Sequence, residues 1–154
     1  MKQLLHKIRH VIQVKLAAIT LFVQAFGWLT LVRLGLRFLP FAQLQSKVDR
    51  MAQKPNRSQG YYTLYGLVWA VEAATRVMPG GAKCLARAMT TQILMGQNGY
   101  PYDLCIGVLK GTTGELKAHA WIESDQKIVM GWLPEIERYK RLEKRFYQGM
   151  ASSI

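Results

Sequence analysis

Apolar positions dominate the first 44 residues in a pattern typical of helices. After a basic start, an apolar stretch runs from Leu16 to Val32 with few polar interruptions. Pro40 ends the pattern, because proline cannot continue the interior of a helix. We therefore predict a helical preamble over residues 1–44, formed by a helix pair that ends near Pro40.

Residues 16–32 leave two interpretations open. The run is just short of the roughly 20 apolar residues that a spanning helix needs, and Lys15 and Arg33 border it closely. Docking on protein, within the chain or on a partner, is the favoured interpretation, and membrane contact is the alternative. A secretory signal is disfavoured, because Ala25-Phe26-Gly27 is a poor cleavage site.

The pattern changes after residue 44. Residues 45–60 are rich in polar side chains and contain Pro55 without apolar periodicity, so we predict a linker. From Tyr61 to Val77, apolar positions recur at helical spacing, and the Pro79-Gly80-Gly81 sequence ends that helix. A second helix is predicted from Ala82 to Met95.

Short apolar or alternating runs follow these helices. We predict strands over Leu104–Leu109, Leu116–Ile122 and Lys127–Met130, separated by turn residues at 111–114 and 124–126. Such strands form an antiparallel meander. Since no strand alternates with a later helix, the fold class predicted for the domain at residues 61–154 is α+β.

Composition limits the partners and cofactors. Lys and Arg total 21 against nine Asp and Glu, a net charge of +12 that favours anionic partners. No nucleic-acid-binding motif is recognisable, so no nucleic-acid partner is predicted. Two cysteines form neither a disulfide framework nor a zinc set, and no phosphate-binding loop is present. We expect no metal, no cofactor, and a cytoplasmic location, with membrane association as the alternative.

Two side chains combine into candidate chemistry. Cys84 follows a glycine loop in the first turn of a predicted helix, where free N–H groups and the helix dipole stabilise a thiolate. His119 is the one histidine of the domain at 61–154 and lies on a predicted strand. Cysteine and histidine act together as nucleophile and base in cysteine enzymes. Cys105 and Gln92 are interpreted as buried structural residues.

The residues around this pair resemble a known family. The run Pro79-Gly80-Gly81-Ala82-Lys83-Cys84, the run Asn98-Gly99-Tyr100-Pro101, the run Ala118-His119-Ala120-Trp121-Ile122-Glu123 and the preamble's Leu39-Pro40-Phe41 are similar to the leader peptidase of lasso peptide biosynthesis. That family has a transglutaminase-like, papain-like core in which the cysteine helix packs on a small antiparallel sheet. The spacing from Cys84 to His119 is similar to the family's.

The resemblance implies a cysteine peptidase that removes the leader from a ribosomally made precursor peptide. Its implied partners are that leader, a separate winged-helix protein that recognises the leader, and an asparagine-synthetase-like cyclase. Two alternatives use the same residues. One is a catalytically inactive peptide-binding module, and the other is an acyltransferase or transglutaminase with an amine acceptor.

One position departs from the family pattern. The family is described with an aspartate that orients the histidine from the next strand, but a hairpin turning at residues 124–126 places Gly131 near His119. Glu135 has the same strand parity and is our weak candidate for a third catalytic residue. A backbone carbonyl, or a dyad without a third member, is the alternative.

Overall fold

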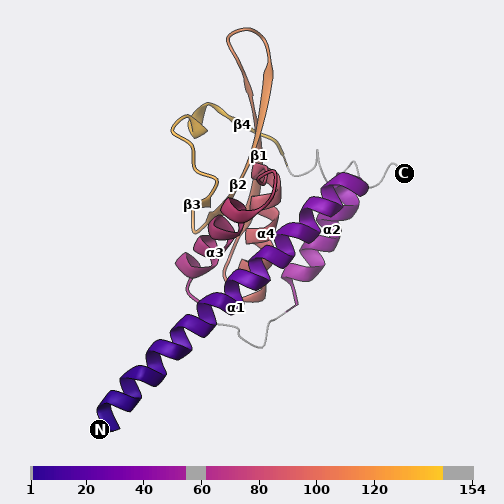
Figure 1. The fold of residues 1–154 in the computed structure, drawn as a ribbon. Coiled ribbons are helices and arrows are strands. Elements are labelled where there is room, and N and C mark those ends of the chain that lie inside the picture. Colours follow the sequence, from indigo (N-terminus) through magenta and orange to yellow (C-terminus); the bar gives the residue numbers. More distant parts are fainter. Residues whose placement is uncertain (1, 55–61, 144–154) are drawn as a thin grey trace.

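The computed structural model describes residues 2–54 and 62–143, with side chains from residue 13 onward, and it confirms the α+β class. Figure 1 labels the helices and strands of the chain and colours them in sequence order. They are α1 (Lys2–Phe38), α2 (Phe41–Ala52), α3 (Leu64–Val77), α4 (Cys84–Gln97), β1 (Asp103–Lys110), β2 (Leu116–Ser124), β3 (Lys127–Met130), the 3-10 helix η1 (Ile136–Arg138) and β4 (Lys140–Arg141).

Four antiparallel strands form one sheet in the order β3-β2-β1-β4. The predicted meander is therefore confirmed, with β1 and β2 paired from Asp103↔Glu123 to Lys110↔Leu116. Asp125 and Gln126 connect β2 to β3 with φ values of 48° and 64°. Positive φ at both central residues is typical of a two-residue hairpin turn, whose backbone matches the strand twist.

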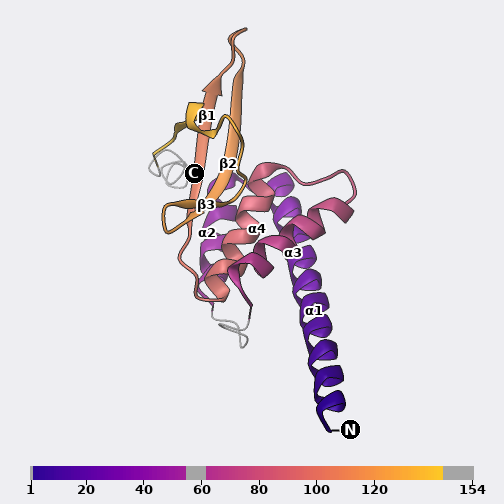
Figure 2. The ribbon, with the colours of Figure 1, turned by 90° about the vertical axis from the view of Figure 1, so that its left-hand side faces the viewer.

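Helix α4 is the centre of the molecule. It contacts α1, α2 and α3 as well as β1, β2 and β3, and Figure 2 shows it between the other helices and the sheet. Every residue from Ala88 to Met95 is buried. The core therefore surrounds α4, and the helices cover one face of the sheet.

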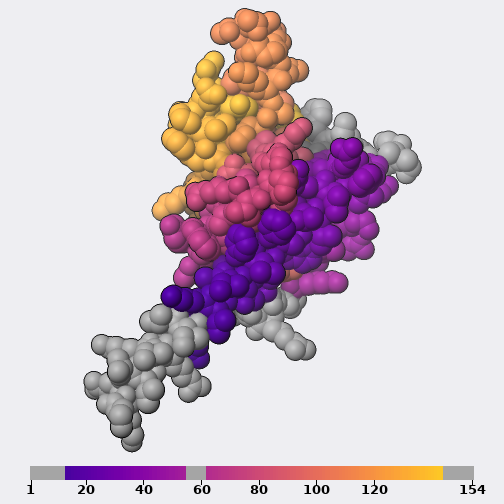
Figure 3. All heavy atoms as spheres, viewed as in Figure 1, coloured from indigo at the N-terminus to yellow at the C-terminus, as the bar shows by residue number. Residues whose placement is uncertain are grey.

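The preamble contains one continuous helix rather than the expected pair. Leu21, Ala25, Leu29 and Val32 are buried at helical spacing on the side of α1 that packs against α3 and α4. Figure 3 shows α1 in indigo along the outside of the body, with the β1–β2 hairpin projecting beyond it. The stretch Gln13–Phe38 is long and apolar enough to cross a membrane, and its outer face is exposed.

Residues 45–52 belong to α2 and not to the expected linker. Its apolar side chains are few but are placed on one side of the helix: Ala42, Leu44, Val48 and Ala52 are all buried. That stripe packs on α4. Ser46, Lys47 and Arg50 between them are exposed, and this polar composition made the segment resemble a linker. Residues 55–60 of the expected linker, together with residue 61, lie outside the described residues.

A buried polar cluster joins α2 to α4. The Gln92 side chain is only 2% exposed and donates to Asp49 Oδ1 at 2.6 Å, and Gln45 donates to the same oxygen at 2.9 Å. Burial and the nearby Asp49 charge raise the pKa of Tyr102 beside this cluster. The hydrogen bond to Asp49 holds the Gln92 side chain in place, which is consistent with the structural role expected for it.

Two helical glycines provide a matched stability test. A Cβ on Gly96 would lie 2.5 Å from Ala52 O, where α2 ends against α4, whereas a Cβ on Gly27 would meet nothing within 4 Å. We predict that Gly96→Ala lowers the free energy of unfolding by about 1–3 kcal/mol. Gly27→Ala raises it by about 0.5–1 kcal/mol, because alanine loses less backbone entropy in a helix. Urea denaturation measures both, and equal effects would contradict the close packing of α2 on α4.

Candidate active site

Cys84 is the first residue of α4 and is partly buried against the core. The preceding loop turns through Gly80 and Gly81, whose φ values of 73° and 66° are strained for any residue with a side chain. Lys83 occupies the N-cap position and makes no side-chain capping hydrogen bond. The thiol therefore lies at a helix N-terminus whose first N–H groups no capping side chain satisfies, an environment that stabilises negative charge.

The two basic neighbours of Cys84 have different roles. Arg87 forms an ion pair with Glu72 of α3 and donates to Met130 Sδ at 3.6 Å. Its charge is thus balanced by Glu72. Lys83 is exposed and forms no ion pair with any described residue. Of the two cations, Lys83 is the one whose field is available at the start of α4.

The His119 ring is held by one short hydrogen bond. Its Nε2 lies 2.7 Å from Gly131 O. A carbonyl oxygen only accepts, so Nε2 carries the proton and donates to it. In the neutral ring, Nδ1 then bears the lone pair. The structure thereby assigns Nδ1 as the basic atom of His119, and Nε2 as the atom that fixes the ring's orientation.

This backbone carbonyl occupies the place beside His119 for which the sequence left the third residue open. Gly131 has φ 83°, and a Cβ there would lie 2.9 Å from Ala120 O, so the position requires glycine. Glu135, the weak candidate from the sequence, is half exposed, with Oε2 3.9 Å from Arg138 Nη1. The contacts of the described residues include no hydrogen bond between Glu135 and His119. The hydrogen-bond partner of the ring is therefore the backbone carbonyl of Gly131, an alternative that the sequence left open.

His119 lies on the face of the sheet that the helices do not cover. Along β2, Ala120 and Ile122 belong to the core with α4, and strand residues alternate between faces. The His119 ring instead stacks near Trp121 at 6.2 Å between centroids and near Tyr139 at 5.7 Å. Segment 131–141 thus covers this face, with Tyr139 over His119 and Gly107.

Cys84 and His119 come from elements in direct contact, since α4 packs on β2. The ring contacts described above, however, are with Gly131, Trp121 and Tyr139, and none of the described hydrogen bonds joins the thiol to the imidazole. Reaction between the two therefore requires the ring to leave this position or the start of α4 to approach it. The structure brings the two elements together, and no hydrogen bond among the described residues joins the two reactive side chains.

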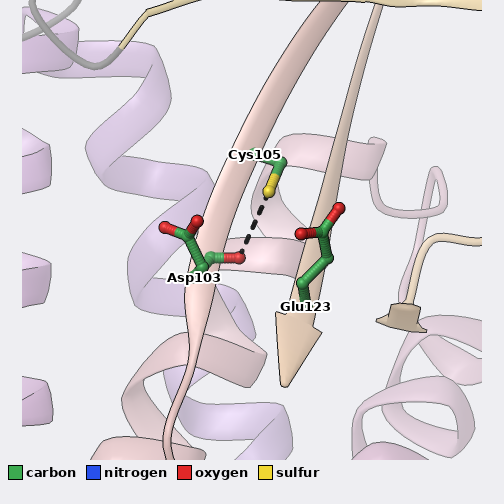
Figure 4. A group of neighbouring side chains, drawn as sticks. All are labelled: Asp103, Cys105 and Glu123. Carbon is green, nitrogen blue, oxygen red and sulfur yellow. Dashed lines mark hydrogen bonds between the residues drawn. The ribbon is translucent and has the colours of Figure 1, made fainter. Parts of the chain in front are cut away.

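Cys105 lies in a polar cluster on that same face. Figure 4 shows it between Asp103 and Glu123, and its Sγ is 3.6 Å from Asp103 O. The Cys105 sulfur and a carboxylate oxygen from each of Asp103 and Glu123 lie within 4.8 Å of one another. Arg141 from β4 forms ion pairs with both carboxylates. Burial raises the pKa of the Cys105 thiol to about 12, so the sulfur is protonated and the cluster serves to attach β4.

Comparison with known proteins identifies the family. A family model described as the transglutaminase-like superfamily matches residues 27–144. The chain belongs to the transglutaminase-like superfamily. The match begins within α1, so it includes residues 27–44 of the predicted preamble as well as the Cys84 and His119 elements. Neither a curated protein nor a solved structure matches the chain significantly.

The tautomer of His119 is directly measurable. We predict that ¹⁵N NMR of the neutral ring shows a protonated Nε2 and an unprotonated Nδ1, because Gly131 O accepts from Nε2. In Gly131→Ala, the strained backbone moves this carbonyl and the preference weakens. A protonated Nδ1 in the unmodified protein would contradict the assignment of the basic atom.

The buried Cys105 thiol predicts a loss of stability at alkaline pH. Because folding raises its pKa from an ordinary value near 9 to about 12, the folded protein binds the proton more tightly. The resulting stabilisation is complete below pH 9 and declines as pH rises toward 12. Urea denaturation at pH 8 and pH 10.5 should therefore show a smaller decline for Cys105→Ala than for the unmodified chain. Identical declines would contradict a protonated, buried thiol.

Proposed function

We propose that this protein is a cysteine peptidase that removes the leader from a ribosomally made precursor peptide. The observation that carries the proposal is the placement of Cys84 as the first residue of the central helix of a transglutaminase-like domain. That superfamily includes cysteine peptidases. The sequences around Cys84 and His119 resemble those of lasso peptide leader peptidases, which supports the narrower assignment.

The mechanism follows from the two reactive atoms. His119 Nδ1 takes the proton of the Cys84 thiol, and the thiolate attacks the last carbonyl carbon of the leader. In this mechanism the Cys84 backbone N–H stabilises the oxyanion. The imidazolium then protonates the leaving amine of the core peptide, and an acyl-enzyme remains. Water, deprotonated by His119, hydrolyses the thioester and releases the leader.

The Gly131 carbonyl performs the orienting role that a carboxylate has in related enzymes. Its oxygen lies 2.7 Å from Nε2 and accepts the Nε2 proton, which leaves the lone pair of the neutral ring on Nδ1. A carbonyl dipole stabilises the imidazolium less than a full negative charge does. We therefore expect slower turnover than in an enzyme with an aspartate at this position.

A second candidate function is a catalytically inactive peptide-binding module. Two observations favour it: the described contacts place no carboxylate against His119, and they include no hydrogen bond between Cys84 and His119. An acyltransferase would share the acyl-enzyme and differ only in using an amine in place of water. The reaction product distinguishes that activity from hydrolysis.

The proposal includes partners for leader capture. A separate winged-helix protein would bind the leader and present it, and an asparagine-synthetase-like cyclase would act on the freed core. The exposed apolar side of α1, which includes Val23, Leu31 and Leu34, offers a docking surface for a protein partner or a membrane. Within this proposal the protein works in the cytoplasm, free or attached to the membrane through residues 16–32.

Thiol labelling separates the peptidase from the inactive module. We predict that iodoacetamide at pH 7.5 modifies Cys84 rapidly and leaves Cys105 unmodified, because Cys105 is fully buried and protonated. His119→Ala should slow labelling of Cys84 if the ring acts on the thiol. Mass spectrometry of digested protein locates the label. Equal, slow labelling of Cys84 with and without His119 would favour the inactive module.

Cleavage is tested with a leader–core precursor peptide, with and without a winged-helix leader-binding partner. We predict two products whose masses sum to the precursor plus one water, and no products with Cys84→Ala. Cys105→Ala is the matched control and should cleave normally. A precursor left intact by the unmodified protein in the presence of the partner would overturn the peptidase assignment.

A further inference from the structure

A basic pocket lies beside the start of α4, on the side of the molecule where α1 ends. Its volume is about 330 Å³, and it is lined by Arg33, Arg37, Gly80, Gly81, Lys83 and Ala86, together with Leu36. Two cations therefore come from the last turns of α1, and the third precedes Cys84. A neighbouring hollow of about 180 Å³ shares Arg33 and Arg37. Arg33 and Arg37 thus border both the pocket and the neighbouring hollow.

No Asp or Glu side chain forms an ion pair with these three cations within the described part of the chain. All nine Asp and Glu residues of the chain fall within the described ranges 2–54 and 62–143. Their ion pairs are with Arg87, Lys117, Arg138 and Arg141. Arg33 donates to Pro79 O at 2.8 Å, which positions its guanidinium over the glycine loop without neutralising it. The pocket is therefore a concentration of positive charge within a protein of net charge +12.

The chemistry of the lining fits a carboxylate. Arginine presents planar N–H donors that match the two oxygens of a carboxylate, and lysine adds a point charge. Gly80 and Gly81 contribute no side chains, so a ligand can approach the loop backbone. Leu36 and Ala86 add apolar surface for the aliphatic part of an acidic side chain. A peptide carrying Asp or Glu satisfies each of these features.

The pocket's position relative to Cys84 sets where that acid lies along a peptide. Ala86 is two residues beyond Cys84, so it faces about 200° around the helix from it. The pocket and the thiol therefore flank the start of α4 on different sides. A helix is about 10 Å across, and an extended peptide advances about 3.3 Å per residue. The acidic side chain would lie roughly three residues from the scissile bond.

We propose that this pocket is a specificity site that binds an Asp or Glu side chain of the peptide substrate. The proposal rests on the proposed peptidase function and adds the chemical class of the residue that the enzyme selects. Arg37 and Lys83 supply the charge, and Arg33 fixes the shape of the loop. A phosphate group on a membrane lipid is the competing anion, and the experiment separates it from the peptide.

The test profiles cleavage of a proteome-derived peptide library by mass spectrometry, with Cys84→Ala as background. We expect Asp and Glu to be enriched at one fixed position relative to the cleaved bond. In Arg37→Gln/Lys83→Gln that enrichment falls by roughly twofold to fivefold for each cation removed. The control variant Arg50→Gln/Lys47→Gln removes the same charge from exposed positions on α2 and should retain the enrichment. Cleavage without acid preference, or a preference equal in both double variants, overturns the pocket and leaves the peptidase intact.

If the library is not cleaved, the peptidase proposal is overturned. The pocket is then tested by a binding measurement. Fluorescence anisotropy with the Cys84→Ala protein compares labelled (Gly-Glu)₄ and (Gly-Gln)₄ peptides. Tighter binding of the acidic peptide, lost in the pocket double variant and kept in the charge-matched control, supports the pocket. Equal binding by both double variants overturns it. If the pocket variant loses binding only to phosphatidylserine vesicles in a flotation assay, the lipid phosphate is the ligand and the peptide proposal is wrong.

Discussion

The burial of α4 is the constraint on which the rest of the structure depends. From Ala88 to Met95 no side chain reaches solvent, so helices must cover every side of α4 that the sheet leaves open. Its polar residues are satisfied locally or by α2: Thr90 and Thr91 donate to carbonyls four residues earlier, and Gln92 donates to Asp49. A helix fixed in this way has little freedom to slide or rotate, because buried polar groups that lose their partners are costly. The position of Cys84 at its first residue follows from that packing.

The sheet divides the candidate chemistry between two faces. Ala120 and Ile122 point to α4, while His119 and Trp121 point to segment 131–141. That segment is attached by the Gly131 contact with His119, by the packing of Tyr139 on the same ring, and by β4, whose Arg141 also forms ion pairs with Asp103 and Glu123. Its connection between these points contains the exposed Trp132 and the short helix η1. These contacts hold His119 on the face of the sheet opposite to α4, because the orientation of β2 decides which of its side chains face the core.

The sequence patterns predicted α3, α4 and the three long strands within a few residues, because each carries a clear period ended by glycine or by a tight turn. Helix α2 was not predicted because only four apolar side chains pack it against the core. Two of these are alanines, which give little signal of helical periodicity among polar neighbours. For the site, Cys84 at the helix start and the position of Gly131 near His119 were foreseeable from spacing alone. The use of the Gly131 carbonyl was left open, because it depends on a bulge between Ile122 and Glu123 and on a positive φ that no pattern reveals.

Charge is distributed unevenly around the start of α4, and this unevenness has a structural origin. Glu72 of α3 neutralises Arg87 on the flank nearer to β3, where Met130 also contacts the guanidinium. On the opposite flank, α1 contributes Arg33 and Arg37 but no acid, because its described side chains include none. A negatively charged peptide approaching α4 would therefore be attracted to the α1 side and not to the α3 side. Under the proposed function, such polarity would orient an extended chain across the helix N-terminus, and that orientation would determine which peptide carbonyl lies next to Cys84.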